Sequence, residues 1–251
     1  QPFPQVRRVV AETFSYFEKS HHIHSLVEFD VTKPRAYIDD HFKTSGEKLS
    51  FTAFIIKCVG KAVEENKLVH AFRFKKKKLI VFNDIDINAI VAREIQGEYI
   101  PNICIIRAAN KKSFKEIHEE IRAAQIDEVK IENYNNLMKN YLRLPRLFRK
   151  LIGPKMIRNP FRVKKYAGTV IVSAVGMFGQ DVGWTIPYPG HPLILTAGGI
   201  TKKPRYVGES IEPREFINIT LSFNHDIIDG APAAQFTSKL KELIEKGFGL
   251  I

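Results

Sequence analysis

The chain has 251 residues, 44% of them hydrophobic and 26% charged, which is typical of a globular domain and excludes a disordered or low-complexity protein. Two cysteines without a C-x-x-C motif argue against a disulfide framework and a zinc knuckle; we expect Cys58 and Cys104 to be buried free thiols in a cytoplasmic protein. The best apolar run, Phe51 to Val63, is interrupted by Lys57 and is too short to span a bilayer.

The first half of the chain mixes helical and strand patterns. Apolar residues at helical spacing predict helices, with Ser50 as an N-cap and Ser113 with Glu116 as a capping box, and β-branched runs predict strands. The predicted helices are Val6–Lys19, Lys33–Lys43, Ser50–Asn66 and Ser113–Ala124, and the predicted strands are Ile23–Val31, Lys78–Phe82, Asp86–Arg93 and Tyr99–Ile106.

The net charge of +12 is concentrated in one segment. From Asn133 to Gln180 there is no Asp or Glu, and the segment has these basic residues: Lys139, Arg143, Arg146, Arg149, Lys150, Lys155, Arg158, Arg162, Lys164 and Lys165. Pro145, Pro154 and Pro160 prevent one long helix. Such a segment is either a solvated basic surface or a site for RNA, DNA, anionic lipid or a phosphorylated ligand.

The last third predicts strands at Gly168–Val175, Pro192–Ala197 and Glu215–Phe223, and a helix at Gly230–Lys246. Few strands are spaced as βαβ units, so the expected class is α+β or mixed α/β, with a central mixed sheet flanked by helices. Gly176, Gly179 and Gly183 do not fit a dinucleotide fingerprint or a P-loop, and they indicate a loop that approaches something closely.

His225 stands at a corner between the last strand and the last helix. The run Leu221-Ser222-Phe223-Asn224-His225-Asp226-Ile227-Ile228-Asp229-Gly230-Ala231 changes from alternation to a turn at this residue. A histidine held at a rigid corner can act as a general base near neutral pH, although a lone histidine at a strand end is more often structural.

This region resembles the catalytic domain of the 2-oxo acid dehydrogenase acyltransferases, the dihydrolipoyl acyltransferase family, which shares the chloramphenicol acetyltransferase fold. His225, Asp229 and Gly230 match the family's His-x-x-x-Asp-Gly signature, within a segment similar to its Ser-Phe-Asp-His-Arg-Val-Ile-Asp-Gly-Ala. The strand Val170–Gly176 is similar to the family's Phe-Thr-Ile-Ser-Asn-Ile-Gly and aligns Ser173 with its serine.

The N-terminal half supports the same resemblance. Arg7–Ala11 resembles the Arg-Lys-x-Ile-Ala opening, and Phe29–Thr32, preceded by His22, resembles the Val-Asp-Val-Thr strand. Lys111–Ser113 resembles the segment that opens the central helix. We therefore expect residues 1–251 to form a single acyltransferase catalytic domain with a basic insert at about 127–166 and no lipoyl or subunit-binding domain.

The resemblance implies acyl transfer between thiols, with His225 as the general base and Ser173 as the hydroxyl donor to the oxyanion. A thiol has an unperturbed pKa of about 8.5 and imidazole one of about 6.5, so neutral imidazole can draw off the thiol proton during attack on a thioester. Coenzyme A is then a substrate, its contact residues remain unassigned, and the chain itself does not bear the lipoyl group.

The family also implies a role for Asp229 and an oligomeric state. In its acetyltransferase relatives the aspartate is mainly structural and pairs with an arginine, for which Arg7 or Arg8 is the candidate here. The family assembles as trimers with each site between two subunits, which places His225 and Ser173 on adjacent chains. A separate lipoyl domain or a 2-oxo acid dehydrogenase is the implied partner.

Besides the expected lack of a lipoyl and a subunit-binding domain, two departures from the family pattern occur, and the second leaves the acyl substrate open. The short segment before the Ser173 strand is replaced by the longer basic stretch. The usual Gly-Leu-x-x-Pro-Val has become Glu98–Ile103, near the acyl pocket of the family.

Several alternatives stay open. They are a non-catalytic core of a multienzyme assembly, a stand-alone transferase with a small-molecule acceptor, and a nucleic-acid or membrane-surface binder that acts through residues 133–165. The histidines His21, His22 and His24 lack acidic or cysteine partners at ligand spacing, so no metal site is predicted, and His191 is expected in a loop.

Overall fold

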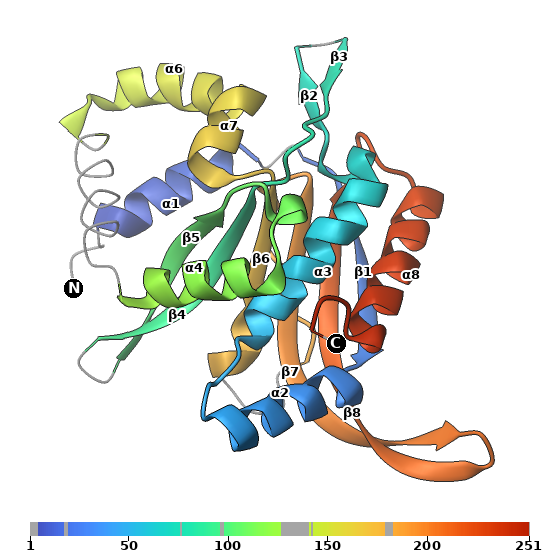
Figure 1. Cartoon of the computed structure of the whole chain (residues 1–251). Coiled ribbons are helices and arrows are strands. Elements are labelled where there is room, and N and C mark those ends of the chain that lie inside the picture. Colours follow the sequence, from blue (N-terminus) through green and yellow to red (C-terminus); the bar gives the residue numbers. More distant parts are fainter. Residues whose placement is uncertain are drawn as a thin grey trace.

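The structure is a computed structural model that describes residues 5–17, 20–75, 77–95, 98–126, 141, 143–178 and 183–250. A mixed six-stranded sheet has the order β1-β8-β7-β6-β4-β5, and β2 and β3 form a separate hairpin (Figure 1). The strands are β1 (His22–Asp30), β2 (Phe72–Phe74), β3 (Lys78–Ile80), β4 (Ile87–Ile95), β5 (Glu98–Ile106), β6 (Val170–Ala174), β7 (Leu193–Val207) and β8 (Ser210–Asn224). Strands β4, β6 and β7 run parallel and the other pairs of the large sheet run antiparallel, which confirms the predicted mixed class.

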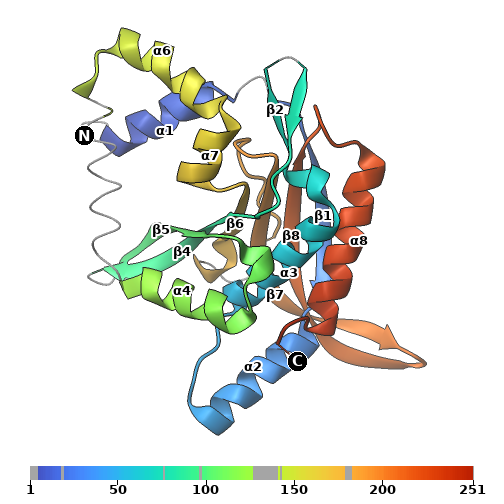
Figure 2. The same ribbon diagram turned by 45° about the horizontal axis from the view of Figure 1, so that its top comes forward.

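Helices cover one face of this sheet and gather at one end of the molecule. They are α1 (Gln5–Ser15), α2 (Thr32–Ser45), α3 (Phe51–Glu65), α4 (Phe114–Ile126), α6 (Arg146–Ile157), α7 (Pro160–Ala167) and α8 (Gly230–Lys246). Helix α3 lies between α4 and α8 over the sheet, while α1, α6 and α7 form a group beside it (Figures 1 and 2). Among the described residues, no helix is both long enough and apolar enough to cross a membrane.

The hydrophobic core lies between the sheet and the helices α3, α4 and α8. Phe54 and Val59 of α3 are fully buried, and the rings of Phe223 in β8 and Phe236 in α8 meet edge to face at 5.7 Å. Cys58 and Cys104 are buried free thiols, as predicted, and burial raises the pKa of Cys58. Helix α3 buries most of its surface against its neighbours, and its charged residues Lys57, Lys61 and Glu64 lie on one remaining stripe.

Local sequence signals place the helix ends where they were predicted. The Ser50 hydroxyl accepts a bond from the Ala53 amide at 3.2 Å and caps α3. Ser113 and Glu116 form the reciprocal capping box, with bonds of 2.7 Å to the Ser113 amide and 3.3 Å to the Glu116 amide. Each cap satisfies backbone donors that the first helical turn leaves free.

The β7–β8 hairpin is much longer than the sequence predicted. Both strands have 15 residues, whereas the expected strands stopped at Ala197 and began at Glu215. Gly198 and Gly199 form a bulge in the ladder rather than its end, and Pro204 stands opposite Pro213 beyond it. The predicted boundaries were wrong because, in the sequence alone, glycine and proline predict the end of a strand.

Among the described residues, the basic segment contains two separate helices, α6 and α7, in agreement with the prediction that it is not one long helix. Asn159, in the short turn between α6 and α7, is the N-cap residue of α7. Its side-chain oxygen accepts hydrogen bonds from the Phe161 and Arg162 amides at 3.1 and 3.4 Å. Pro160 occupies the first turn of α7, where its missing N–H costs nothing. The start of the predicted insert, residues 127–140, lies outside the described residues, as does Gly179.

Two buried histidines connect distant parts of the fold. His191 Nε2 donates to the Ala167 carbonyl at 3.0 Å, and the His191 carbonyl accepts from His22 Nε2 at 3.0 Å. His70 lies 3.1 Å from the Thr169 hydroxyl. Burial lowers the pKa of both His70 and His191 to about 4, so each ring is neutral in the folded protein at neutral pH.

We predict that these histidines weaken the fold in mild acid. Their folded-state pKa lies below the unfolded value of about 6.5, so the unfolded chain binds protons first and stability falls as the pH drops from 6.5 toward 4. Between pH 7 and pH 5, His191 should account for a loss of about 1–2 kcal/mol in the free energy of unfolding. Urea unfolding of the parent and of His191→Gln at both pH values measures this loss, and equal losses in the two proteins would contradict it.

Candidate active site

His225 is held at the corner after β8 by backbone hydrogen bonds on both sides. Its amide donates to the His21 carbonyl at 2.9 Å, and the preceding Asn224 amide donates to the Pro192 carbonyl at 2.9 Å. The residues after it turn back, since the Ile228 amide donates to the Asn224 carbonyl at 3.0 Å. The last strand, the start of β1 and the loop before β7 therefore all fix the position of this histidine.

The orientation of the His225 ring follows from one short contact. Nδ1 lies 3.0 Å from the Ile228 carbonyl oxygen, and a carbonyl can only accept, so Nδ1 bears the proton of the neutral ring. Nε2 then keeps its lone pair, which is the tautomer that a general base requires. The side chain is 43% exposed, so a substrate can reach the ring.

Asp229 lies beside this ring as the N-cap residue of α8. Its carboxylate is 3.7 Å from His225 Nδ1, too far for a hydrogen bond, and its side chain is 88% exposed. It makes no side-chain cap bond. Arg7 and Arg8 are exposed on α1, and within the described part of the chain neither forms the predicted ion pair with Asp229, whose recorded partner is His225.

Ser173 lies in the middle of the sheet, on β6. It is half-buried and pairs with Ile90 of β4 and with Thr196 of β7. Its neighbours Val172 and Ala174 line a cavity beneath α3. Because side chains alternate along a strand, Ser173 lies on the opposite face of the sheet.

A row of hydroxyl groups crosses three strands on the face of Ser173. Thr196 pairs with Ser173, and Thr220 of β8 pairs with Thr196. Thr196 and Thr220 are buried, and neither hydroxyl has a hydrogen-bond partner among the described residues. This row was not predicted from the sequence, because Thr196 lies in an apolar stretch whose pattern predicts only a buried strand.

The two predicted catalytic residues lie far apart within one chain. Ser173 and Thr220 share a register two strands apart, and His225 lies five residues beyond Thr220. With about 3.3 Å per residue and about 4.8 Å between strands, their Cα atoms are on the order of 20 Å apart. One chain alone therefore does not present both side chains to the same reacting atoms.

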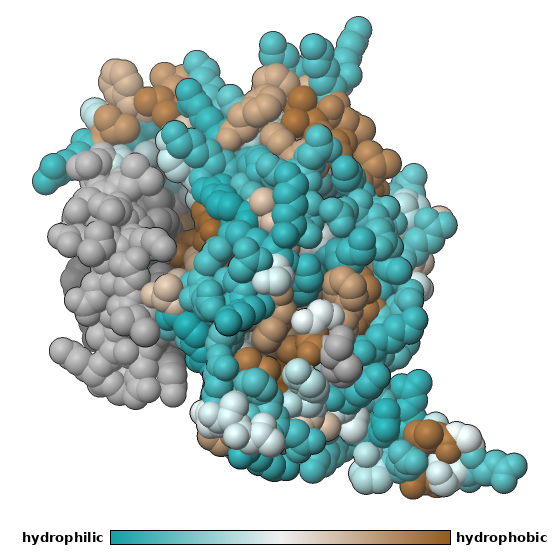
Figure 3. Space-filling model, viewed as in Figure 1, coloured by the Kyte–Doolittle hydropathy of each residue, from teal (hydrophilic) through white to brown (hydrophobic). Residues whose placement is uncertain are grey.

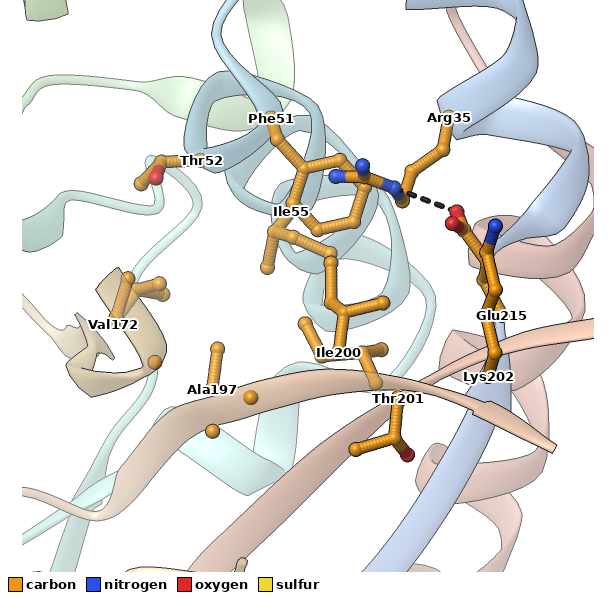
Figure 4. A pocket seen from close by; sticks show the side chains of 15 residues that line it. Arg35, Phe51, Thr52, Ile55, Val172, Ala197, Ile200, Thr201, Lys202 and Glu215 are labelled. Atoms are coloured by element: carbon orange, nitrogen blue, oxygen red, sulfur yellow. Dashed lines mark hydrogen bonds and ion pairs between the residues drawn. The ribbon is translucent and has the colours of Figure 1, made fainter. Parts of the chain in front are cut away.

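The cavity beneath α3 has a volume of about 600 Å³ and lies between α3 and the middle of β7 (Figure 4). Phe51, Ile55 and Ile200 point into it, and Arg35 extends across Phe51 to Glu215, with Nε and Oε2 at 2.7 Å. This ion pair joins α2 to β8 at the edge of the cavity. Sequence analysis did not find it, because its members are 180 residues apart.

The other histidines of the β1 region are individually partnered. His21 Nδ1 lies 3.0 Å from Asp226, and His24 Nδ1 lies 2.8 Å from the Ser222 hydroxyl. Burial, with a smaller effect of His22, lowers the pKa of His24. Among the residues that the structure describes, no group of three or more potential metal ligands occurs.

Comparison with protein families agrees with this arrangement. The sequence model described as "2-oxoacid dehydrogenases acyltransferase (catalytic domain)" matches residues 1–133 and 163–250. The chain belongs to this family. The matched residues include His225, Ser173 and Asp229, and the internal stretch that is not matched, 134–162, lies within the basic segment.

A relative of this family member is also named as an acyltransferase. The chain is 28% identical, over 97% of its length, to the lipoamide acyltransferase component of the branched-chain alpha-keto acid dehydrogenase complex of Bacillus subtilis. It covers 51% of that protein, so the chain spans about half the length of this relative.

Solved structures confirm the fold of this family member. A probable dihydrolipoamide acetyltransferase from Listeria monocytogenes matches with a TM-score of 0.73 and 25% identity, over 98% of this chain and 94% of that chain. A chloramphenicol acetyltransferase matches with a TM-score of 0.52 and 14% identity, over 97% and 99% of the two chains, and shows the fold alone. The predicted chloramphenicol acetyltransferase-like fold is confirmed.

We predict that Gly176 is required for the turn that follows Ser173. A Cβ on Gly176 would lie 2.0 Å from the Gly198 carbonyl oxygen, a backbone atom that cannot move without disturbing the β7 bulge. Gly176→Ala should therefore lower the free energy of unfolding by about 1–3 kcal/mol. Gly190→Ala is the matched control, since its Cβ meets nothing within 4 Å, and equal urea midpoints for the two variants would contradict the prediction.

Proposed function

We propose that this chain is an acyltransferase that moves an acyl group between coenzyme A and a thiol acceptor of the dihydrolipoamide kind. The observation that carries the proposal is the fixed ring of His225, whose Nδ1–H is held by the Ile228 carbonyl in a side chain that is 43% exposed. Family membership supports it, because the match includes the strand of Ser173 and the corner of His225.

In the proposed reaction, His225 Nε2 accepts the proton of the attacking thiol as its sulfur bonds to the thioester carbonyl carbon. The carbonyl oxygen becomes an oxyanion, which the Ser173 hydroxyl stabilises by donating a hydrogen bond. When the intermediate collapses, the original carbon–sulfur bond breaks and the imidazolium returns its proton to the departing thiolate. The acyl group changes sulfur atoms and no acyl-enzyme forms.

The site is proposed to form between two copies of the chain. Within one chain Ser173 and His225 are on the order of 20 Å apart, whereas a hydroxyl donor and a base must both contact one thioester. A cyclic trimer, the assembly that the resemblance implies, would bring the His225 corner of one copy to the Ser173 strand of the next. The β7–β8 hairpin extends away from the body and exposes Tyr206 and Ile211, which suits it to contact a neighbouring copy (Figure 1).

Asp229 is proposed to be a positioning residue. Its carboxylate lies 3.7 Å from the ring, but the Ile228 carbonyl rather than Asp229 accepts the hydrogen bond from Nδ1. The lipoyl group is proposed to come from a separate domain or chain. The buried free thiols Cys58 and Cys104 suit a reducing compartment, and we propose a cytoplasmic location.

We predict that His225→Ala lowers kcat by about 10²–10⁴, because a positioned general base contributes that much. Ser173→Ala should lower kcat by about 10²–10³, the usual effect of one oxyanion donor. Thioester exchange between acetyl-, succinyl- or isobutyryl-coenzyme A and dihydrolipoamide measures both effects.

His41→Ala and Ser45→Ala are the matched controls, since both residues lie on α2 and neither has a role in the proposed reaction. Full activity of His225→Ala would contradict the assigned base. Absence of exchange by the parent protein with all three thioesters would contradict the proposed reaction itself.

A further inference from the structure

Helix α6 presents an apolar face to solvent. Its inner face packs on α1, where Arg149 pairs with Glu12 at 2.8 Å and Gly153 contacts the ring of Tyr16. On the outer face, Leu147, Phe148 and Leu151 are 76%, 57% and 63% exposed. Figure 3 shows these apolar atoms gathered over α6 at the upper left of the molecule. A helix this short, held by one face, leaves the other without a partner in the described part of the chain.

Basic side chains surround this apolar face. Within the described residues, no carboxylate lies within 4 Å of the following exposed cations: Arg143, Lys150, Lys155, Arg158, Arg162 and Lys165. The inner cation Lys164 differs, since it pairs with the buried Asp86 at 2.6 Å. Lys164 therefore anchors α7, while the outer cations remain available to a partner.

The β2–β3 hairpin adds to the same end of the molecule. Phe161 of α7 meets Phe74 and Phe82 edge to face, at 6.4 and 5.7 Å, which holds the hairpin beside α7 (Figures 1 and 2). The hairpin exposes Lys75, Lys77 and Lys78. We call α6, α7 and this hairpin the basic–apolar end.

A small hollow lies on this end, next to α6. It has a volume of about 410 Å³ and is lined by Met156, Phe161, Arg162, Lys165 and Tyr166. Two cations and exposed aromatic rings around one hollow suit an anionic headgroup, since Arg and Lys contact phosphate while aromatic rings sit at the membrane interface.

We propose that the basic–apolar end docks on an anionic phospholipid bilayer. Exposed leucine and phenylalanine on a helix bordered by lysine and arginine is the pattern of a helix that lies in the membrane interface. The apolar face of α6 would enter the acyl boundary, while the surrounding cations contact acidic headgroups. This proposal is independent of the acyl transfer reaction.

Two other occupants fit this end less well. Nucleic acid would use the cations, but the exposed Leu147 and Leu151 offer it neither a charge nor a stacking surface. A second copy of the chain, with a net charge of +12, would bring the same cations against each other, which costs electrostatic energy. An anionic bilayer uses both the apolar and the basic side chains.

Sedimentation of the full chain with vesicles tests the proposal. We expect binding to phosphatidylcholine vesicles with about one third phosphatidylserine and little binding to pure phosphatidylcholine. The charge variant Lys150→Gln/Arg162→Gln/Lys165→Gln should bind at least tenfold more weakly, since each cation contributes about fivefold. The apolar variant Leu147→Ser/Phe148→Ser/Leu151→Ser should bind weakly even at low salt.

Lys33→Gln/Lys48→Gln/Lys115→Gln is the matched control, because it removes the same charge from exposed residues elsewhere on the surface. Equal weakening by this control would overturn the proposal in favour of nonspecific attraction. The proposal would also be overturned if the apolar variant bound vesicles as tightly as the parent, whether or not its assembly became smaller. It would be overturned as well if the parent bound single-stranded RNA more tightly than anionic vesicles. Thioester exchange at the parental rate shows that each variant is folded. If the parent shows no exchange, urea unfolding tests the folding of each variant instead.

Discussion

The backbone hydrogen bonds that join β6, β7 and β8 determine where the reactive groups of this chain lie. Ser173 pairs with Thr196, Thr196 pairs with Thr220, and the same ladder runs on to the corner at His225. A strand cannot slip by one residue without turning its apolar side chains away from α3. The sheet thus holds the hydroxyl row and the histidine corner rigidly, and also keeps them apart.

This separation has a chemical consequence. The corner holds a histidine with a defined tautomer, the proposed base, since the Ile228 carbonyl accepts a hydrogen bond from Nδ1 of His225. The middle of the sheet holds the hydroxyl groups of Ser173 and Thr196. In the proposed reaction each chain therefore contributes two half-sites, and a second copy completes each one. The interior supports this arrangement with the buried, neutral His191, whose hydrogen bonds to His22 and Ala167 keep the start of β1 and the loop before β7 in place.

Much of the fold could be predicted from the sequence because its signals are local. Ser50, the Ser113–Glu116 capping box and the bounds of α8 each depend on residues within a few positions of one another. The β7–β8 hairpin could not be predicted at its full length, because a bulge at Gly198–Gly199 looks like a strand end until the partner strand is known.

In the candidate site, too, local sequence predicted some features while others depend on the fold. The residue types and spacing around His225 and Ser173 suggested their roles through a family resemblance, but their distance depends on strand order, which no local pattern encodes. The Arg35–Glu215 pair and the unpartnered Thr196 hydroxyl likewise arise only when distant segments meet. The predicted partner of Asp229 was an arginine on α1, whereas the structure places the carboxylate against His225.

In the proposed site, His225 of one copy acts with Ser173 of another. Inactive His225→Ala and Ser173→Ala chains can be mixed as unfolded proteins in equal amounts and refolded together. In a cyclic trimer every mixed assembly regains one intact site, so the mixture should recover about a quarter of the parental activity. Recovery at that level supports a shared site. A mixture that forms mixed assemblies yet stays as inactive as its components would contradict it.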